Sequence, residues 1–371
     1  MRYNELPQDS KGFSGMKITL QYLLTISIML TALLNLQAQD NKQEPEILKL
    51  DTSLVSIEVN INSKTSSKNI AGLTAQDFTV YEDGVKQKVE NFASTESPFN
   101  LVLMVDTSGS ARDEVDLMKK AARRFLNELR PQDRIAVVEL NQRVTVMEGL
   151  TSDREKIESA IDFLQPGTGT SFYDALQITL DEVLNKAEGR KAVIILTDGV
   201  DSVGGATFDE ILPEIERAKV TTYFLEVNTE AKTEAGMMRN CEDEKSFHFS
   251  RKQLKKYLNE YAEGLDDARY DDHCELSKLE RMQINRRLYE SARKELREMA
   301  SQTGGKVYPC KRLAELEPAY SQIAAELRTQ YSIGYYPTNE KHDGKWRTIK
   351  IEMKKPGLTA KTKPGYRAPE E

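Results

Sequence analysis

Histidine and cysteine are both scarce in this chain, which holds three residues of each type in 371. These side chains supply many of the general bases, thiol nucleophiles and zinc ligands of enzymes. The short strings that mark phosphate loops, serine-hydrolase elbows, zinc proteases and thiol redox centres are also missing. The sequence therefore favours a protein that is not an enzyme.

An excess of positive charge is missing too. The chain has a formal net charge of -7 at pH 7, whereas a dedicated nucleic-acid-binding protein normally carries a basic face. We therefore expect no nucleic-acid partner. The contents of 39% hydrophobic and 30% charged residues are typical of a chain with much exposed surface, and the length suits one large domain with accessories or two domains.

A long apolar run is absent from the N-terminal region. The run from Leu23 to about Leu36 has roughly 14 residues, and a membrane-spanning helix needs about 20. Lys17 precedes this run and the small residue Ala38 follows it, which predicts a secretory signal peptide over residues 1–38, with Met16 as an alternative start. An uncleaved signal anchor and a buried core helix stay open as alternatives. We expect a secreted or periplasmic, cell-envelope protein that touches a membrane only if the signal is retained.

The cysteines are few for an exported protein. Oxidising conditions predict one disulfide and one free thiol. Cys241 with Cys274 is the preferred pair, because both lie in one polar segment, but connectivity cannot be read from sequence and Cys310 is the third candidate. Cys241, His248, His273 and Cys274 can also be imagined as a zinc set. Their spacing fits no common zinc pattern, so a solvated segment with a disulfide is favoured.

Oxygen-bearing side chains follow two apolar runs. Residues 101–105 and 192–196 have the pattern of buried parallel strands, and they end in D-T-S-G-S and T-D-G respectively. Open α/β sheets place ligands at the carboxyl ends of such strands. A threonine before a further amphipathic helix adds another hydroxyl. Carboxylates and hydroxyls are hard donors that suit Mg²⁺ or Mn²⁺. The sequence predicts a metal site formed by Asp106, Ser108, Ser110, Thr170 and Asp198.

These three motifs, in this order, resemble the von Willebrand factor type A family, whose metal-ion-dependent adhesion site combines D-x-S-x-S, a distant Thr and the Asp of T-D-G. The resemblance implies a Rossmann-like α/β fold: a doubly wound, mostly parallel sheet with helices on both faces. It also implies that Ser108 and Ser110 bind the metal directly, that Thr170 binds directly or through water, and that the two aspartates often act through water. Asp113 and Glu114 lie where integrin relatives hold an adjacent ion, but first-turn acids that complement a helix dipole are the favoured interpretation.

Two further strings lie outside the region of alternating strands and helices. F-x-V-Y-E-D-G at residues 78–84 and Q-Y-x-x-G-Y-Y-P at 330–337 resemble a bacterial exported subfamily of the same relatives. The Asp-Gly pair between alternating runs predicts a hairpin. Each flank is too short to bury a sheet face alone, so we expect the two to pair into a small antiparallel β domain. The predicted organisation is a signal peptide (1–38), an N-terminal β segment (45–97), a first part of the type A domain (98–229), a charged helical insertion (230–290), a last part of the type A domain (291–330) and a C-terminal β segment (331–371).

A metal held by five oxygens leaves an open coordination position that attracts an anion. The leading hypothesis is an exported, non-enzymatic module that binds a protein or matrix ligand through an exposed acidic residue of that ligand. An envelope assembly or scaffolding subunit that docks a partner through the same site is the alternative. A metal-dependent hydrolase is less favoured, because such a site usually needs a general base near the metal and further carboxylates.

Overall fold

The computed structural model describes residues 54–63, 72–93, 98–261 and 268–370, which belong to one unit of the chain. The predicted signal peptide and the first residues of the predicted N-terminal β segment lie outside these ranges. Among the residues that are described, no helix combines the length and the apolar character needed to cross a bilayer.

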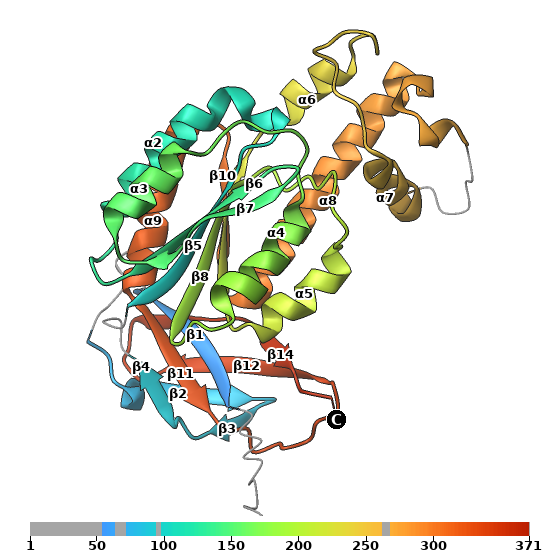
Figure 1. Ribbon diagram of the computed structural model, residues 1–371. Helices are drawn as coiled ribbons and strands as arrows, with labels where there is room; N and C mark the ends of the chain where they lie inside the picture. Colours follow the sequence, from blue (N-terminus) through green and yellow to red (C-terminus); the bar gives the residue numbers. More distant parts are fainter. Residues whose placement is uncertain (1–53, 64–71, 94–97, 262–267, 371) are drawn as a thin grey trace, which may run out of the picture. The chain divides into compact units, whose positions relative to one another are not determined.

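A six-stranded sheet forms the centre of the larger domain (Figure 1). Its neighbouring strands are parallel except for the last strand, which runs antiparallel to its neighbour. Strand β5 (Phe99–Asp106) is buried at every position, which is why its sequence contains a continuous apolar run rather than an alternating one. The strands, in sheet order, are β10 (Lys306–Cys310), β9 (Thr221–Val227), β8 (Arg190–Thr197), β5 (Phe99–Asp106), β6 (Arg134–Leu140) and β7 (Val144–Thr151).

Helices cover both faces of this sheet, as Figure 1 shows. One face packs against α2 (Val115–Leu126), α3 (Arg154–Asp162) and α9 (Leu316–Arg328). The other face packs against α4 (Phe172–Ile178), α5 (Phe208–Arg217) and α8 (Lys278–Thr303). The predicted doubly wound, mostly parallel fold is therefore confirmed. The sequence also predicts that a helix and a strand after the insertion return to this sheet as its last elements, and the parallel pairing of β10 with β9 confirms it.

The sequence also predicts local features of four helices: a Ser152–Glu155 capping box, a helix over 172–187, a helix starting just after Ser110 and a Thr207–Glu210 capping box. In the structure Asp153 caps α3, because its side chain accepts bonds from the backbone N–H groups of Glu155 and Lys156. The helix that begins with α4 changes to a π-helical turn, Thr179–Leu184. A 3₁₀ segment, Gly109–Glu114, comes before α2. The capping box of α5 is confirmed.

The two flanks pair into small antiparallel sheets, as predicted. They share one apolar core between a sheet of order β13-β1-β11-β4 and a sheet of order β14-β12-β2-β3. The alternating pattern of residues 358–366 predicts one strand, and this prediction is wrong. The segment splits around Pro364, which has no backbone N–H to donate, and its two halves join different sheets. The strands are β1 (Val55–Ser63), β2 (Phe78–Glu82), β3 (Val85–Gln87), β4 (Asn91–Ala93), β11 (Gln330–Tyr335), β12 (Trp346–Met353), β13 (Leu358–Lys361) and β14 (Gly365–Arg367).

A buried carboxylate joins the two flanks. Glu82 at the end of β2 accepts hydrogen bonds of 2.8 Å from the hydroxyls of Tyr335 and Tyr366. The next two residues, Asp83 and Gly84, both have positive φ values, 47° and 80°, which is the geometry of a tight hairpin turn. The two strings noticed in the sequence, residues 78–84 and 330–337, thus meet through Glu82 and Tyr335.

The charged segment after β9 folds into helices around a small core of its own. It contains α6 (Glu230–Met237), α7 (Arg251–Tyr261) and two 3₁₀ turns, Ala268–Asp271 and His273–Glu275. Cys241 and Cys274 form a disulfide, and Cys310 is free and buried. The boundary predicted at 290 falls inside α8, so the insertion and the sheet domain share one continuous helix (Figure 1).

Candidate metal centre

Parallel pairing brings the two acidic strand ends together. Strand β5 pairs with β8 in a register that places Val105 opposite Leu196. The residues that follow, Asp106 and Thr197-Asp198, therefore leave the sheet side by side at its carboxyl edge. This is the edge at which open α/β sheets bind their ligands.

Asp106 is held rigidly beneath the surface and is only 2% exposed. One of its carboxylate oxygens accepts the Ser108 backbone N–H at 2.9 Å, and the other accepts the Thr197 hydroxyl at 2.7 Å. The first bond closes the D-x-S turn, and the second ties β5 to β8. Both hydrogen bonds fix the orientation of the Asp106 carboxylate.

Three further oxygens form a continuous chain above Asp106. The Ser108 and Ser110 hydroxyl oxygens are 3.1 Å apart, and Ser110 donates to a carboxylate oxygen of Asp198 at 3.1 Å. The second Asp198 oxygen accepts the Val200 backbone N–H at 3.0 Å. Side chains that lie far apart in the sequence thus converge within hydrogen-bond distance of one another.

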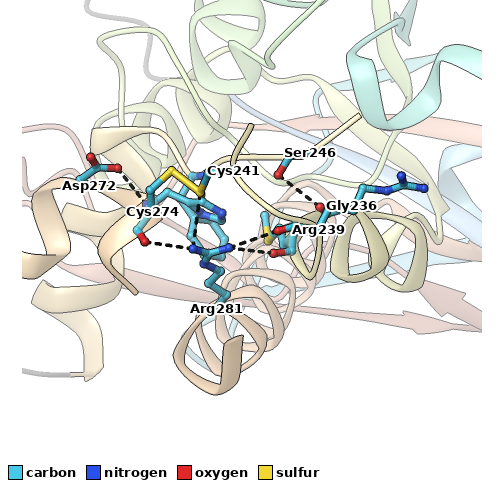
Figure 2. The surroundings of a disulfide bond; sticks show 10 residues. Gly236, Arg239, Cys241, Ser246, Asp272, Cys274 and Arg281 are labelled. Atoms are coloured by element: carbon cyan, nitrogen blue, oxygen red, sulfur yellow. Dashed lines mark hydrogen bonds between the residues drawn. A yellow bond between two sulfur atoms is a disulfide. The ribbon is translucent and has the colours of Figure 1, made fainter. Parts of the chain in front are cut away.

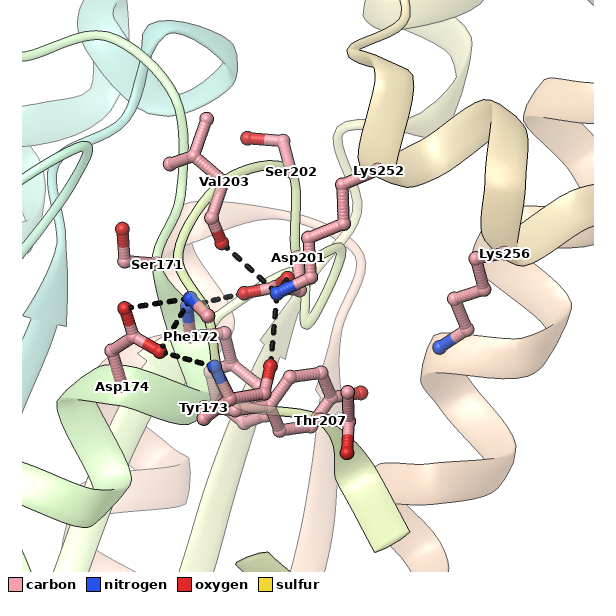
Figure 3. A network of polar contacts seen from close by, with 12 residues as sticks. Ser171, Phe172, Tyr173, Asp174, Asp201, Ser202, Val203, Thr207, Lys252 and Lys256 are labelled. Atoms are coloured by element: carbon pink, nitrogen blue, oxygen red, sulfur yellow. Dashed lines mark hydrogen bonds and ion pairs between the residues drawn. The ribbon is translucent and has the colours of Figure 1, made fainter. Parts of the chain in front are cut away.

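Hydrogen bonds of its backbone hold Thr170 at the same edge of the sheet. Its N–H donates to the Ser202 hydroxyl at 2.8 Å, and its carbonyl accepts the N–H groups of Ser202 and Val203 at 2.9 and 3.1 Å. Figure 3 shows the neighbouring support, in which Asp201 accepts the Phe172 N–H at 2.7 Å. The loop before α4 is therefore fastened to the loop after β8, and all five predicted residues lie at one sheet edge.

The electrostatics of this edge favour a cation. Burial and the neighbouring charge of Asp198 raise the pKa of Asp106 to about 7. Two buried carboxylates repel each other, and a divalent cation between them would offset that repulsion. The predicted ligand atoms at this edge are all side-chain oxygens, which is the set that Mg²⁺ and Mn²⁺ prefer. The residues present therefore fit such an ion.

Two contacts to Asp198 come from residues that the sequence did not indicate. The Thr229 hydroxyl donates to the Asp198 oxygen that also accepts from Ser110, and the Tyr289 hydroxyl lies 3.4 Å from that oxygen. Tyr289 belongs to α8, so the helix shared with the insertion reaches this sheet edge. A tyrosine in a polar helical pattern carries no motif, so no sequence signal could have found it.

A groove of about 760 Å³ opens above these oxygens. Ser108, Ser110, Thr170 and Asp198 line its floor. Its walls include side chains of the insertion, among them Phe247 and Leu288, and four basic residues, namely Arg112, Lys232, Arg239 and Lys245. Glu244 is the acidic residue that lines the same walls. Basic groups thus outnumber acidic ones around the floor.

Comparison with known proteins defines the class of this domain. Residues 101–200 match the family model of the von Willebrand factor type A domain, so this part of the chain is a domain of that family. No curated protein matches the chain.

Three solved structures to which the chain is similar are given next. Proximal thread matrix protein 1 from the mussel byssus, solved with a zinc-occupied metal-ion-dependent adhesion site, is 18% identical with a TM-score of 0.43, covering 66% of this chain and 49% of that one. BatB from Bacteroides thetaiotaomicron is 16% identical with a TM-score of 0.39, covering 62% and 98%. A von Willebrand factor type A protein from Catenulispora acidiphila is 14% identical with a TM-score of 0.41, covering 85% and 72%. The chain spans about half the length of the mussel protein.

Proposed function

We propose that this protein is a non-enzymatic binding module that holds a divalent cation, Mg²⁺ or Mn²⁺, and uses it to bind a carboxylate of a protein or matrix ligand. The observation that carries the proposal is the convergence of Ser108, Ser110 and Asp198 above the buried Asp106. Oxygen atoms from the loop after β5 and the loop after β8 meet there, and Thr170 lies at the same sheet edge. The match to the von Willebrand factor type A family supports an interaction module rather than an enzyme.

The cation would be held by Asp106, Ser108, Ser110, Thr170 and Asp198. When bound, it supplies an electrophilic position that an incoming carboxylate can complete. Asp106 stays oriented by Thr197 and by the Ser108 backbone. The contacts from Thr229 and Tyr289 fix Asp198 on the side of the insertion.

The walls of the groove favour an acidic ligand. Arg112 and Lys245 are exposed beside the floor, and Lys232 contacts Glu114 at 3.3 Å from the same side. That ion pair also engages Glu114, one of the two acids that follow the D-x-S-x-S loop, so this carboxylate is less available as a general base. A basic wall around a bound cation attracts anionic side chains over a longer range than the cation alone.

Export is a further part of the proposal. The N-terminal signal pattern supports a secreted or periplasmic, cell-envelope location. The disulfide in the insertion is consistent with an oxidising compartment. In the envelope, the same site could dock a partner subunit of an assembly, which is the alternative function.

Capture of extracellular or envelope proteins on the immobilised full chain tests this function. We expect capture in Mg²⁺, loss of capture with a chelator, and loss with Ser110→Ala. Ser321→Ala is the matched control, because its exposed hydroxyl lies on α9 and bonds to Glu128 at 2.8 Å. Capture that is unchanged by chelator and by Ser110→Ala would contradict the proposal. Recovery of envelope subunits alone would favour the assembly alternative.

A further inference from the structure

The insertion contacts the loop after β8 through a lysine of α7. Lys252 lies on the first turn of α7, and its Nζ is 2.5 Å from a carboxylate oxygen of Asp201. The same ammonium group donates to the carbonyl oxygens of Val203 and Ala206 at 3.1 and 2.9 Å. Figure 3 shows the Lys252 side chain pointing into this loop. One cation therefore holds the loop at three oxygen atoms.

The loop after β8 in turn holds Thr170. The Ser202 N–H donates to the Thr170 carbonyl at 2.9 Å, and the Ser202 hydroxyl accepts the Thr170 N–H at 2.8 Å. Asp201 uses the carboxylate oxygen that does not face Lys252 to accept the Phe172 N–H. Lys252 is therefore linked to the backbone on both sides of the loop before α4 through one short segment.

A second lysine of α7 supports the same region one helical turn further on. The Lys256 Nζ is 2.6 Å from a carboxylate oxygen of Glu295 on α8, a residue that is only 8% exposed. Glu295 also accepts the hydroxyl of Tyr173, which follows Phe172 in α4. Side chains four residues apart lie on the same face of a helix. One face of α7 thus directs two ammonium groups at two acids beside the start of α4.

The insertion gives α7 a fixed support. Arg281 of α8 donates to the Cys274 carbonyl at 3.2 Å, beside the disulfide that joins Cys274 to Cys241 (Figure 2). Just before α7, the Phe249 N–H donates to the His273 ring at 3.2 Å. These contacts tie the segments around α7 to one another and to α8, so the two lysines act from an anchored helix.

The contact between Lys252 and Asp201 is partly withdrawn from water. The side chain of Asp201 is 3% exposed and that of Lys252 is 27% exposed. A buried carboxylate that loses its cationic partner is strongly unfavourable, and two backbone carbonyls would lose their donor as well. Removal of the lysine should therefore release the loop after β8, and with it the loop before α4.

We propose that Lys252 is a positioning residue of the metal centre, which fixes the loop after β8 so that Thr170 stays at the sheet edge. The inference rests on the proposed function for the presence of a metal, but the link from Lys252 to the Thr170 backbone can be measured without one. Groups that orient the ligands of a metal typically change its affinity by about 10- to 100-fold when they are removed. The insertion thus sets the affinity of the site in addition to forming a wall of the groove.

Hydrogen exchange of the metal-free full chain tests the link itself. Lys252→Met keeps an unbranched side chain and removes the charge. We expect the amides of Phe172 and Ser202 to exchange at least about fivefold faster in the variant, relative to the amides of β5, which report global stability. Lys255→Met is the matched control, because Lys255 is an exposed lysine of the same helix. Unchanged relative exchange at the two amides in Lys252→Met would overturn the proposal.

Mn²⁺ binding to the full chain tests the effect on the site. The electron paramagnetic resonance signal of free Mn²⁺ falls as the ion binds, so it reports affinity directly. We expect Lys252→Met to weaken binding at least about tenfold and Lys255→Met to bind as the wild type does. Lys252→Arg should restore most of the affinity, because a guanidinium keeps the charge and several donors. Rescue by arginine would not follow from a role in core packing alone.

The outcomes separate this inference from the proposed function. Mn²⁺ binding that is as tight in folded Lys252→Met as in the wild type overturns this inference and leaves the proposed function standing. A wild-type chain that binds no Mn²⁺ overturns both. Circular dichroism checks that the variants are folded. If Lys252→Met does not fold, Lys252→Gln replaces it with the same expectations, because its neutral amide cannot serve Asp201 as a cation.

Discussion

At the scale of single residues, the candidate metal centre places two buried carboxylates close together, and one bound cation would offset their repulsion. Asp106 and Asp198 are both buried, and each is held by donors rather than by a basic partner in the contacts described above. Hydroxyls partly offset the negative charge, but they cannot neutralise it. A divalent cation would do so, and its removal should leave a measurable cost.

This cost predicts how the stability of the protein depends on pH when a chelator has removed the metal. The pKa of Asp106 is about 7 in the folded chain against an ordinary value of 3.8. Between these values the folded state binds more protons than the unfolded state, so stability should fall as pH rises from about 4 to about 7. The decrease should be a few kcal/mol, at roughly 1.4 kcal/mol per pKa unit.

Asp106→Asn should remove this decrease, because an amide does not ionise. Denaturant unfolding of both proteins at pH 5 and pH 8 in a chelator measures the difference. Mg²⁺ should restore the wild-type stability at pH 8 and leave the variant unchanged. An equal pH dependence in the two proteins would show that Asp106 is not the group responsible.

The meeting of the five oxygen-bearing residues at one sheet edge could be predicted from the sequence, because each follows an apolar run or precedes a helix in a recognisable order. Their binding of a metal stays a prediction. Thr197 was present in the same T-D-G string, but its role in holding Asp106 depends on the pairing of β5 with β8. Thr229 and Tyr289 could not be predicted, because Thr229 follows β9 and Tyr289 lies on α8, and both reach Asp198 only through the tertiary packing.

At the scale of elements, the junction between α8 and β10 closes the central sheet. The helix ends at Gly304, whose φ of 75° places it in the left-handed region. The following Gly305 packs directly on β9: a Cβ added there would lie 1.9 Å from the Thr222 carbonyl oxygen. The two adjacent glycines are therefore needed for different reasons, one conformational and one steric.

Alanine substitutions distinguish these reasons. Gly304→Ala should destabilise the protein by about 1 kcal/mol, the usual cost of this change at a left-handed position. Gly305→Ala should cost about 3 kcal/mol or more, because the backbone of β9 or β10 has to move. Denaturant unfolding of both variants measures the difference, and a smaller effect at Gly305 than at Gly304 would contradict this packing.

Helices and strands were predicted well where one pattern of apolar and polar residues covers the whole element. They were predicted poorly where two patterns meet inside one element or one pattern spans two. Apolar runs such as residues 101–105 identified the buried strands. The boundary predicted at 290 falls inside α8, whose first part packs in the core of the insertion and whose last part packs on the sheet. A change in composition inside one helix therefore resembles a change of domain. The strand 358–366 was broken by Pro364, whose missing donor matters only when the pairing partners are known.

At the scale of the whole molecule, the domain with the metal centre lies between two β segments that pair with each other. Strand β1 pairs with β11 and β13, and β2 pairs with β12, so the two flanks cannot complete their sheets separately. Their union could be predicted from the sequence, since each flank was too short to be stable alone. The bond between Glu82 and Tyr335 explains why the two flanking strings carry these residues.

Removal of that bond should loosen the flanks. Tyr335→Phe leaves the buried Glu82 carboxylate with one donor fewer and should cost about 1–3 kcal/mol. Tyr336→Phe is the matched control, because its side chain is 47% exposed, and it should cost nothing measurable. Hydrogen exchange of β2 and β11 reports the local effect, and equal exchange in both variants would count against the role of Glu82.

The central claim is that the five oxygen ligands hold one divalent cation, and calorimetric titration of the metal-depleted, disulfide-intact chain tests it most directly. Titration with Mg²⁺ or Mn²⁺ should show one site in the wild type and in Ser321→Ala. The same titration should show no binding at that site in Asp198→Ala or Ser110→Ala. A wild-type protein that binds neither ion, or variants that bind both as tightly as the wild type, would contradict the account.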